Sequence, residues 1–134
     1  MDYTIYDMSS VVISIQLPMY GYAAMQLEME SERIKASWIA IADGGSVIDQ
    51  GERVIQRPFN MLVELISKAD VSIQEDVSLR RDWSWIIYNA SGDIIRGQSA
   101  GYWPLNYLEN VLRIIEQYTN DSSITEWIRD VVEV

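Results

Sequence analysis

Asp43 is the residue whose position could most easily support chemistry, because it follows the apolar run IAIA and precedes Gly44 and Gly45. A carboxylate at the end of a central strand can bind a divalent cation, and Glu64 on the next expected helix could add an oxygen ligand for Mg²⁺. The later strands offer no acid in a matching order, however, and Ala90 occupies the equivalent position in the second half of the chain. Since Asp is also favoured where a turn begins, we expect Asp43 to form a turn and not a metal site.

The residue inventory excludes several classes of catalytic site. The chain has no cysteine and no histidine, so thiolate nucleophiles, imidazole bases, Ser-His-Asp triads and Cys/His zinc sites are excluded. Glu75 and Asp76 are adjacent acids, but the glycine and the later glutamate of an EF-hand calcium loop are missing. Gly44 and Gly45 lack the lysine of a phosphate-binding loop. We therefore expect no catalytic residue, no cofactor and no metal ion, and interpret the chain as a protein that is not an enzyme.

The chain is strongly acidic, with a formal net charge of −10 at pH 7. Direct binding to nucleic acid or to an anionic membrane is disfavoured, because contacts to phosphate require Lys and Arg. The acids are in excess towards both ends of the sequence. Residues 1–32 contain no base and five acids, namely Asp2, Asp7, Glu28, Glu30 and Glu32. Such a surface can simply keep a protein soluble, or it can form an acidic face that recognises a basic partner protein.

Alternating hydrophobicity predicts the strands that would position these residues. In residues 11–17 and 25–30 every second side chain is apolar, which is typical of a sheet with one buried face. Residues 71–79 have a looser version of the same pattern. Two hairpins are expected where glycine can adopt the positive φ of a tight turn, at Gly44–Gly45 and at Gly92.

Helical spacing of apolar residues follows each expected hairpin, at residues 57–70 and 104–118. Each of these segments opens with Pro-x-Asn, and proline suits the first turn of a helix because its missing N–H is not needed there. The asparagine can accept a hydrogen bond from a free amide at the same terminus. A C-terminal helix is expected at residues 123–133, with Ser123 and Glu126 at the spacing of a capping box.

The two halves of the chain repeat the same order of elements. The pattern Pro-x-Asn-x-Leu at Pro58 recurs 46 residues later at Pro104, and the Ser-Trp-Ile of residues 37–39 recurs 47 residues later. We therefore predict two tandem βββα units, residues 22–69 and 71–118, that form an antiparallel sheet packed by helices. The fold class is α+β, with N-terminal strands and a C-terminal helix outside the repeat.

Aromatic residues are concentrated in the second half of the chain. Strand alternation places Trp83 and Trp85 on one face and Tyr88 on the other, so both faces of this hairpin are rich in apolar area. One face should pack against the helices, and the other needs cover from the N-terminal strands, a second subunit or a partner. We expect Trp38 and Trp85 in the core. The residues predicted to contact a partner are Asp2, Asp7, Glu28, Glu30, Glu32, Tyr102 and Trp103, which are the N-terminal acids and two aromatic residues beside a helix start.

The second half also resembles the YegP-like family of small bacterial tandem-repeat domains. Those repeats consist of an aromatic alternating strand, an Asn-Gly-type turn, a second strand ending near Gly-Tyr, and a short amphipathic helix. The residues that match this outline are Trp83, Trp85, Asn89, Gly92, Ile94, Ile95, Gly101 and Tyr102. The resemblance implies the same βββα fold and adds no activity.

These observations favour a single domain, residues 1–134, that works by binding. Its function is predicted as that of an acidic inhibitor, such as an immunity protein, antitoxin or anti-defence factor, that occupies a basic surface of a nuclease or other nucleic-acid enzyme. One alternative is a structural module that associates with itself, for example as a homodimer. A second alternative is a carboxylate metal-dependent hydrolase of the ribonuclease H-like type. The expected compartment is the cytoplasm, because no apolar run is long enough to cross a bilayer and no basic signal region opens the sequence.

Overall fold

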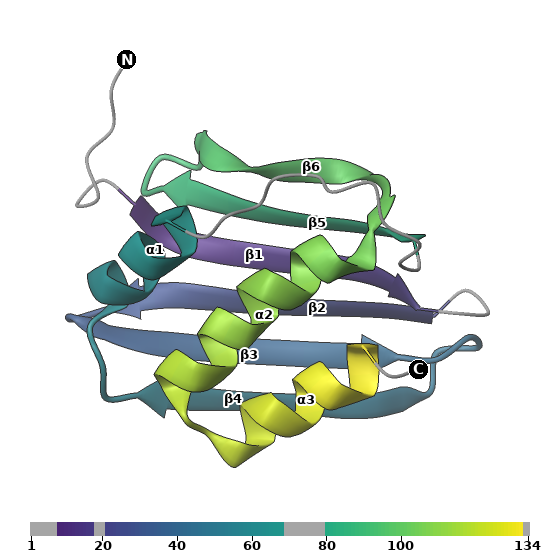
Figure 1. Cartoon of the computed structure of the whole chain (residues 1–134). Helices are drawn as coiled ribbons and strands as arrows, with labels where there is room; N and C mark the ends of the chain where they lie inside the picture. The colour runs from purple at the N-terminus through teal and green to yellow at the C-terminus, as the bar shows by residue number, and fades with distance from the viewer. Residues whose placement is uncertain (1–7, 18–20, 69–79, 133–134) are drawn as a thin grey trace.

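The computed structural model describes residues 8–17, 21–68 and 80–132 (Figure 1). The strands of this part of the chain are β1 (Met8–Leu17), β2 (Gly21–Glu30), β3 (Arg33–Ile41), β4 (Val47–Ile55), β5 (Arg80–Asn89) and β6 (Ile94–Pro104). Its helices are α1 (Phe59–Lys68), α2 (Leu105–Thr119) and α3 (Ser122–Val132). The predicted α+β class is therefore confirmed. Within these ranges, none of the helices has both the length and the apolar character needed to span a bilayer.

The strands form one six-stranded sheet in the order β4-β3-β2-β1-β5-β6, and every neighbouring pair is antiparallel. The first strand, β1, lies in the middle of this sheet. Ile13 of β1 is opposite Met25 of β2 on one side and opposite Trp85 of β5 on the other. The β1–β5 pairing therefore joins the two halves of the chain into a single sheet.

All three helices lie on the same face of the sheet, with α2 crossing it diagonally and α3 running back over β3 and β4 (Figure 1). This arrangement follows from the period-2 pattern, because alternate side chains of each strand point to the helix layer. Val11, Ile13 and Ile15 of β1 are at most 1% exposed, whereas the side chains between them are half-buried. Trp38 and Trp85 are also buried, as predicted.

The two predicted hairpin turns are confirmed. Gly44 and Gly45 have φ of 89°, and Gly92 has φ of 84°, a region that favours glycine because it has no Cβ. In the second turn, the Asn89 Oδ1 atom accepts hydrogen bonds from the backbone N–H groups of Ser91 and Asp93, at 3.0 and 2.9 Å. This is an Asx-type turn, in which the side chain takes the place of a backbone acceptor.

The helix starts agree only in part with the predictions. Helix α2 begins directly after Pro104, as expected, but Asn60 in the first turn of α1 has its Oδ1 atom buried without a hydrogen-bond partner. At α3 the predicted cap, Ser123, is also wrong. Asp121 caps this helix instead, because its Oδ1 accepts hydrogen bonds from Ser123 N and Ile124 N at 2.9 and 3.1 Å.

The two halves share a strand-strand-helix order. The β3–β4 hairpin precedes α1 and the β5–β6 hairpin precedes α2, with β5 starting at Arg80, 47 residues after β3 starts at Arg33. The remaining strand that was predicted for the second unit, residues 71–79, lies outside the described residues. The structure thus shows a hairpin followed by a helix in each half, and the tandem βββα repeat stays a prediction.

Candidate functional site

The face of the sheet opposite the helices has no covering layer among the residues that the structure describes. Paired residues of an antiparallel ladder point to the same face, so the register identifies the side chains that lie on it. Gln26 is opposite Val12 on one side and Ser37 on the other, and Ile39 is opposite Ala24 and Gln50. We call this surface, formed by the strand side chains that point away from the helices, the open face.

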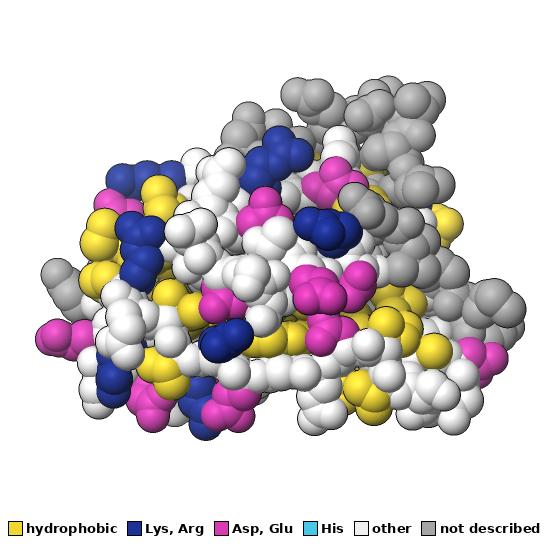
Figure 2. Space-filling view, turned by 90° about the horizontal axis from the view of Figure 1, so that it is seen from below, with side chains coloured by type: hydrophobic (Ala, Val, Ile, Leu, Met, Phe, Trp, Pro, Cys, Tyr) yellow, Lys and Arg dark blue, Asp and Glu magenta, His cyan; other side chains and the backbone are white. Residues whose placement is uncertain are grey.

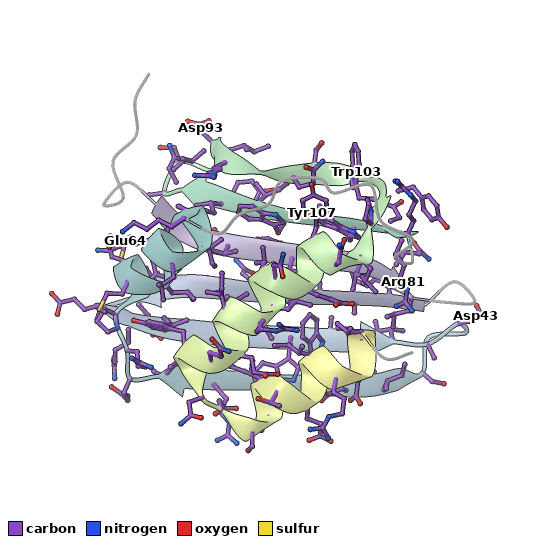
Figure 3. The ribbon with its side chains drawn as sticks, viewed as in Figure 1. Asp43, Glu64, Arg81, Asp93, Trp103 and Tyr107 are labelled. Carbon is purple, nitrogen blue, oxygen red and sulfur yellow. The ribbon has the colours of Figure 1, made fainter. Side chains whose placement is uncertain are left out.

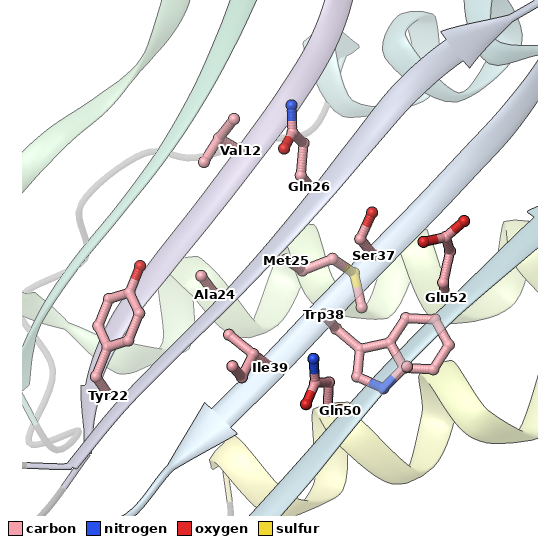
Figure 4. Close-up of a pocket in the computed structure, with 11 residues that line it drawn as sticks. Val12, Tyr22, Ala24, Met25, Gln26, Ser37, Trp38, Ile39, Gln50 and Glu52 are labelled. Carbon is pink, nitrogen blue, oxygen red and sulfur yellow. The ribbon is translucent and has the colours of Figure 1, made fainter. Parts of the chain in front are cut away.

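The open face contains a depression of about 620 Å³ over β1 to β4 (Figure 4). It is centred on the small side chains of Ala24 and Ser37, and the larger side chains of Tyr22, Gln26 and Gln50 stand around them. The full lining consists of Val12, Tyr22, Ala24, Met25, Gln26, Ser37, Trp38, Ile39, Gln50, Gly51 and Glu52. Small residues in the middle of the sheet and longer ones around them therefore make this part of the open face concave.

A second, smaller depression of about 130 Å³ lies beside the first, over β1, β5 and β6. Ser14 and Ser84 are directly opposite each other in its lining, with Asp82 and Ala100 nearby. Tyr22 belongs to both depressions and is 46% exposed. Tyr22 is therefore the residue that a molecule bound in either depression would touch.

The electrostatic character of the open face is mild. Lys35 Nζ lies 3.6 Å from the Glu52 carboxylate, so the basic and acidic side chains at this part of the surface neutralise each other. Gln16 Nε2 donates a hydrogen bond to the Gly21 carbonyl at 3.1 Å. Hydroxyl, amide and apolar groups dominate the rest, which suits contact with another molecule better than proton transfer.

The predicted partner-contacting residues fall into two groups that the fold separates. Glu28 and Glu30 end β2, Glu32 follows in the β2–β3 turn, and Tyr102 and Trp103 end β6. Asp2 and Asp7 lie outside the described residues.

The distance between the two groups follows from the register. Glu28 is level with Tyr88 of β5 through their common neighbour Ser10, whereas Tyr102 is opposite Asp82. Six residues of strand, about 20 Å, separate those two levels along the sheet. The acidic and aromatic candidates therefore do not form one site.

The two aromatic candidates also differ from each other. Tyr102 is 69% exposed on the open face. Trp103 points to the helix side, where it is half-buried, packs against the core and donates a hydrogen bond from Nε1 to the Ser99 carbonyl at 3.0 Å. Of the two, Tyr102 has the exposure that a contact residue needs.

The acids considered as metal ligands lie far apart. Asp43 is exposed in the β3–β4 turn, and Glu64 is on α1 at the opposite end of the sheet (Figure 3). Glu64 is engaged by Lys68, whose Nζ lies 2.8 Å from its carboxylate. Asp43 and Glu64 therefore cannot share an ion in this arrangement. Among the residues that the structure describes, no group of three or more acids is close enough to hold a metal, and Glu75 and Asp76 lie outside them.

Sequence reasoning missed the centre of the open face. The alternation of β2 and β3 did indicate that Gln26 and Glu28 point away from the core, but it could not show which strands would be neighbours. Only the β1–β2–β3 pairing brings Val12, Gln26 and Ser37 into one row. The missed signal was the combination of small Ala24 and Ser37 with Tyr22 in adjacent strands.

Comparison with known proteins adds no further constraint: no family model, no curated protein and no solved structure matches this chain. The resemblance to YegP-like domains remains a prediction.

Proposed function

We propose that this chain is a non-catalytic binding protein that docks through the open face of its sheet onto a basic protein surface. In this role it would act as an inhibitor of the immunity, antitoxin or anti-defence type, and its target would be a nuclease or another nucleic-acid enzyme. The observation that supports the proposal is the position of the helices, which all lie on one face of the sheet, so that no described helix covers the other face. We place this activity in the cytoplasm, the compartment that the sequence predicts.

The composition of the open face supports binding. Tyr22 and Tyr102 are 46% and 69% exposed, and both are of a type that is enriched at interface hot spots. Gln26 and Gln50 add amide groups that can both donate and accept hydrogen bonds. A concave surface bordered by an exposed tyrosine and by amide groups matches the aromatic and polar composition of protein–protein interfaces.

The net charge supports a basic partner. The open face itself is nearly balanced, so the attraction would come from the field of the whole molecule, with its net charge of −10. Such a field acts over about 8 to 10 Å at physiological ionic strength and mainly raises the association rate. The aromatic contacts would then set the lifetime of the complex.

The proposal is tested by affinity capture from the native cell with three immobilised baits: the wild-type chain, Tyr22→Ala on the open face, and Gln117→Ala on the exposed side of α2. We expect wild type and Gln117→Ala to retain the same basic protein. Tyr22→Ala should bind the purified partner more weakly, on the order of 30-fold if Tyr22 is a hot spot. The association rate should fall as salt is raised from 50 to 500 mM, about tenfold or more.

Three outcomes would contradict the proposal. The first is that no protein is retained, and the second is that Tyr22→Ala retains the partner as well as wild type does. The third is an association rate that does not change with salt, which would contradict the charge-led encounter.

We also propose that the two halves arose from one βββα building block. The support comes from the hairpin and helix of each half, which recur 47 and 46 residues apart with a buried Trp in each hairpin, Trp38 and Trp85. Superposition of an experimental structure of residues 22–69 on residues 71–118 tests this, and failure of the strand at 71–79 to match β2 would contradict it.

A further inference from the structure

Among the strands that the structure describes, β4 forms one edge of the sheet and has β3 as its single neighbour. Its side chains include three that are apolar and exposed, Val47 at 55%, Ile48 at 51% and Val54 at 44%. Figure 2, which looks at the molecule from the side of β4, shows a band of hydrophobic side chains between acidic and basic ones. An exposed edge with apolar side chains is a template for pairing with another strand.

The opposite edge is less suited to pairing. Strand β6 has two register shifts against β5 and contains Gly97, whose φ of 151° is rare for other residues. Such irregularities bend an edge and discourage a further strand. Strand β4 has one register shift against β3, between Val47 and Asp49, and from Asp49 to Ile55 its register is continuous.

The sequence of β4, VIDQGERVI, is complementary to itself when it is read in the opposite direction. If two copies pair antiparallel with Gly51 opposite Gly51, Ile48 is opposite Val54 and Asp49 is opposite Arg53. Gln50 is then opposite Glu52. Each of these pairs occurs twice, once on either side of the central glycines.

Every pair in this register is favourable. Ile48 and Val54 bury apolar area that is now exposed, and Asp49 and Arg53 carry opposite charges on the same face of the sheet. The amide of Gln50 can donate to the carboxylate of Glu52. Charges on an edge strand usually oppose pairing, but here their order makes them complementary.

Moving the two-fold axis by one residue in either strand direction keeps each side chain on its own face of the sheet, but it loses these pairs. With Gln50 at the centre, Ile48 would be opposite Glu52. With Glu52 at the centre, two carboxylates would face each other, which is destabilising. The charge pattern therefore selects the pairing centred on Gly51.

The present partners of Arg53 do not prevent this pairing. Arg53 Nε lies 3.6 Å from the Asp121 carboxylate, and Nη2 donates to Ser123 Oγ at 3.2 Å. A guanidinium has five N–H donors, so Arg53 can keep these contacts and still reach a second carboxylate. Its side chain is 53% exposed.

We propose that this chain forms a two-fold symmetric dimer in which β4 pairs antiparallel with β4 of a second copy about Gly51, giving a continuous twelve-stranded sheet. The interface is isologous, as expected for a homodimer. It uses the edge of the sheet, including Gln50 and Glu52 at the rim of the open face, and leaves the part of that face over β1 to β3 accessible, so it does not depend on the partner proposed above.

A charge exchange tests the dimer. Asp49→Lys puts lysine opposite Arg53 of the second copy, and Arg53→Glu puts glutamate opposite Asp49. A dimer of either variant with itself therefore contains two like-charge pairs. We expect wild type to sediment as a dimer and each variant to dimerise about tenfold or more weakly. An equimolar mixture of the two variants should dimerise as wild type does, because all cross-strand charges are then opposite.

Matched controls separate this effect from unfolding. Ile94→Lys places the same new charge at an exposed position on the β6 edge, 62% exposed in the native chain, and should leave the dimer intact. Val54→Lys should weaken the dimer while the chain stays folded by circular dichroism. A wild-type chain that remains monomeric up to millimolar concentration would overturn the proposal. So would a mixture that stays monomeric, or an effect of Ile94→Lys equal to that of Val54→Lys.

Cysteine cross-linking tests the register in the same protein, which contains no cysteine of its own. Gln50→Cys and Glu52→Cys on different copies would be directly opposite, with Cα atoms about 4.5 to 5.5 Å apart, within the range of a disulfide. We expect a disulfide-linked dimer when the two variants are mixed and oxidised, and little from either variant alone. Equal cross-linking of Gln50→Cys to itself would contradict the register centred on Gly51.

Discussion

At the scale of single residues, the chain uses polar side chains to fasten elements that lie far apart in the sequence. Tyr118 at the end of α2 donates a hydrogen bond from its hydroxyl to the Pro58 carbonyl at 2.6 Å. Arg57 donates to the Tyr118 carbonyl at 2.7 Å, and its guanidinium lies 4.3 Å from the centre of the Tyr118 ring. The start of α1 and the end of α2 are thereby held together.

The pKa of Tyr118 gives a prediction that depends on pH. Burial raises this pKa above 10, and the positive charge of Arg57 opposes the rise in part. The folded state therefore favours the protonated phenol, so the stability that Tyr118 contributes is complete below pH 10 and is lost as the pH rises through the folded-state pKa. Tyr118→Phe should lower the free energy of unfolding by about 1 kcal/mol at pH 8, with a smaller difference from wild type at pH 11.

Urea unfolding at both pH values measures this difference, and Tyr102→Phe is the control because Tyr102 is largely exposed. A difference in unfolding free energy between wild type and Tyr118→Phe that is larger at pH 11 than at pH 8 would contradict the raised pKa of Tyr118.

Residue-level predictions from the sequence were accurate where a local rule decides the outcome. The positive φ at Gly45 and Gly92 and the helix start at Pro104 all follow from backbone constraints within a few residues. The cap of α3 was assigned to Ser123 because its spacing to Glu126 fits a capping box. Asp121 caps the helix instead, and it is also paired with Arg53 from β4, a contact that no local rule could reveal.

At the scale of elements, each hairpin places an indole over a glycine of its outer strand. A Cβ at Gly51 would lie 2.3 Å from the Trp38 ring, and a Cβ at Gly101 would lie 2.5 Å from the Trp103 ring. Both glycines are needed because a flat aromatic ring occupies the space of their side chains. Strand β4 can therefore be an edge strand and still cover Trp38.

This close packing predicts the effect of one added methyl group. Gly51→Ala should lower the free energy of unfolding by about 1 to 3 kcal/mol, because Trp38 must leave its position. Ser46→Ala, in the exposed turn before the same strand, should change it by less than about 0.5 kcal/mol. Chemical unfolding followed by tryptophan fluorescence measures both, and equal small effects would show that Trp38 moves without cost.

Strands and helices were predictable because their periodicity is local. Which strands pair with each other in the sheet was not predictable. The predicted hairpins at Gly44–Gly45 and Gly92 became β3–β4 and β5–β6. The sheet order depends on the pairing of Ile13 with Trp85, residues 72 positions apart, which no window of the sequence encodes. For the same reason the centre of the open face was missed, since its side chains come from four strands, β1 to β4.

At the scale of the whole molecule, α3 packs on the sheet through its buried side chains, of which Trp127 is the largest. Trp127 is fully buried, and its Nε1 atom donates a hydrogen bond to the Ile39 carbonyl of β3 at 3.0 Å. This hydrogen bond joins residues that are 88 positions apart in the sequence. The C-terminal helix completes the cover over β3 and β4.

Removal of this side chain should therefore affect the stability of the whole domain. Trp127→Ala should cost about 3 to 5 kcal/mol of unfolding free energy, as expected for the loss of a fully buried indole. Glu126→Ala, on the exposed side of the same helix, should cost less than about 0.5 kcal/mol. Urea unfolding checks both values, and a Trp127→Ala variant as stable as wild type would mean that α3 is not part of the cooperative unit.

The central position of β1 has a consequence for biosynthesis. A ribosome completes β1 at Leu17, whereas β5, which forms one of its two ladders, is completed only at Asn89. At about 5 to 20 residues per second, the two events are several seconds apart. During that interval the nascent chain can form the β1–β4 meander, and one side of β1 stays unpaired beside the translating ribosome. Folding of the domain is therefore completed only after β5 has been translated, and a chaperone that binds extended apolar segments would find its target at residues 11–17.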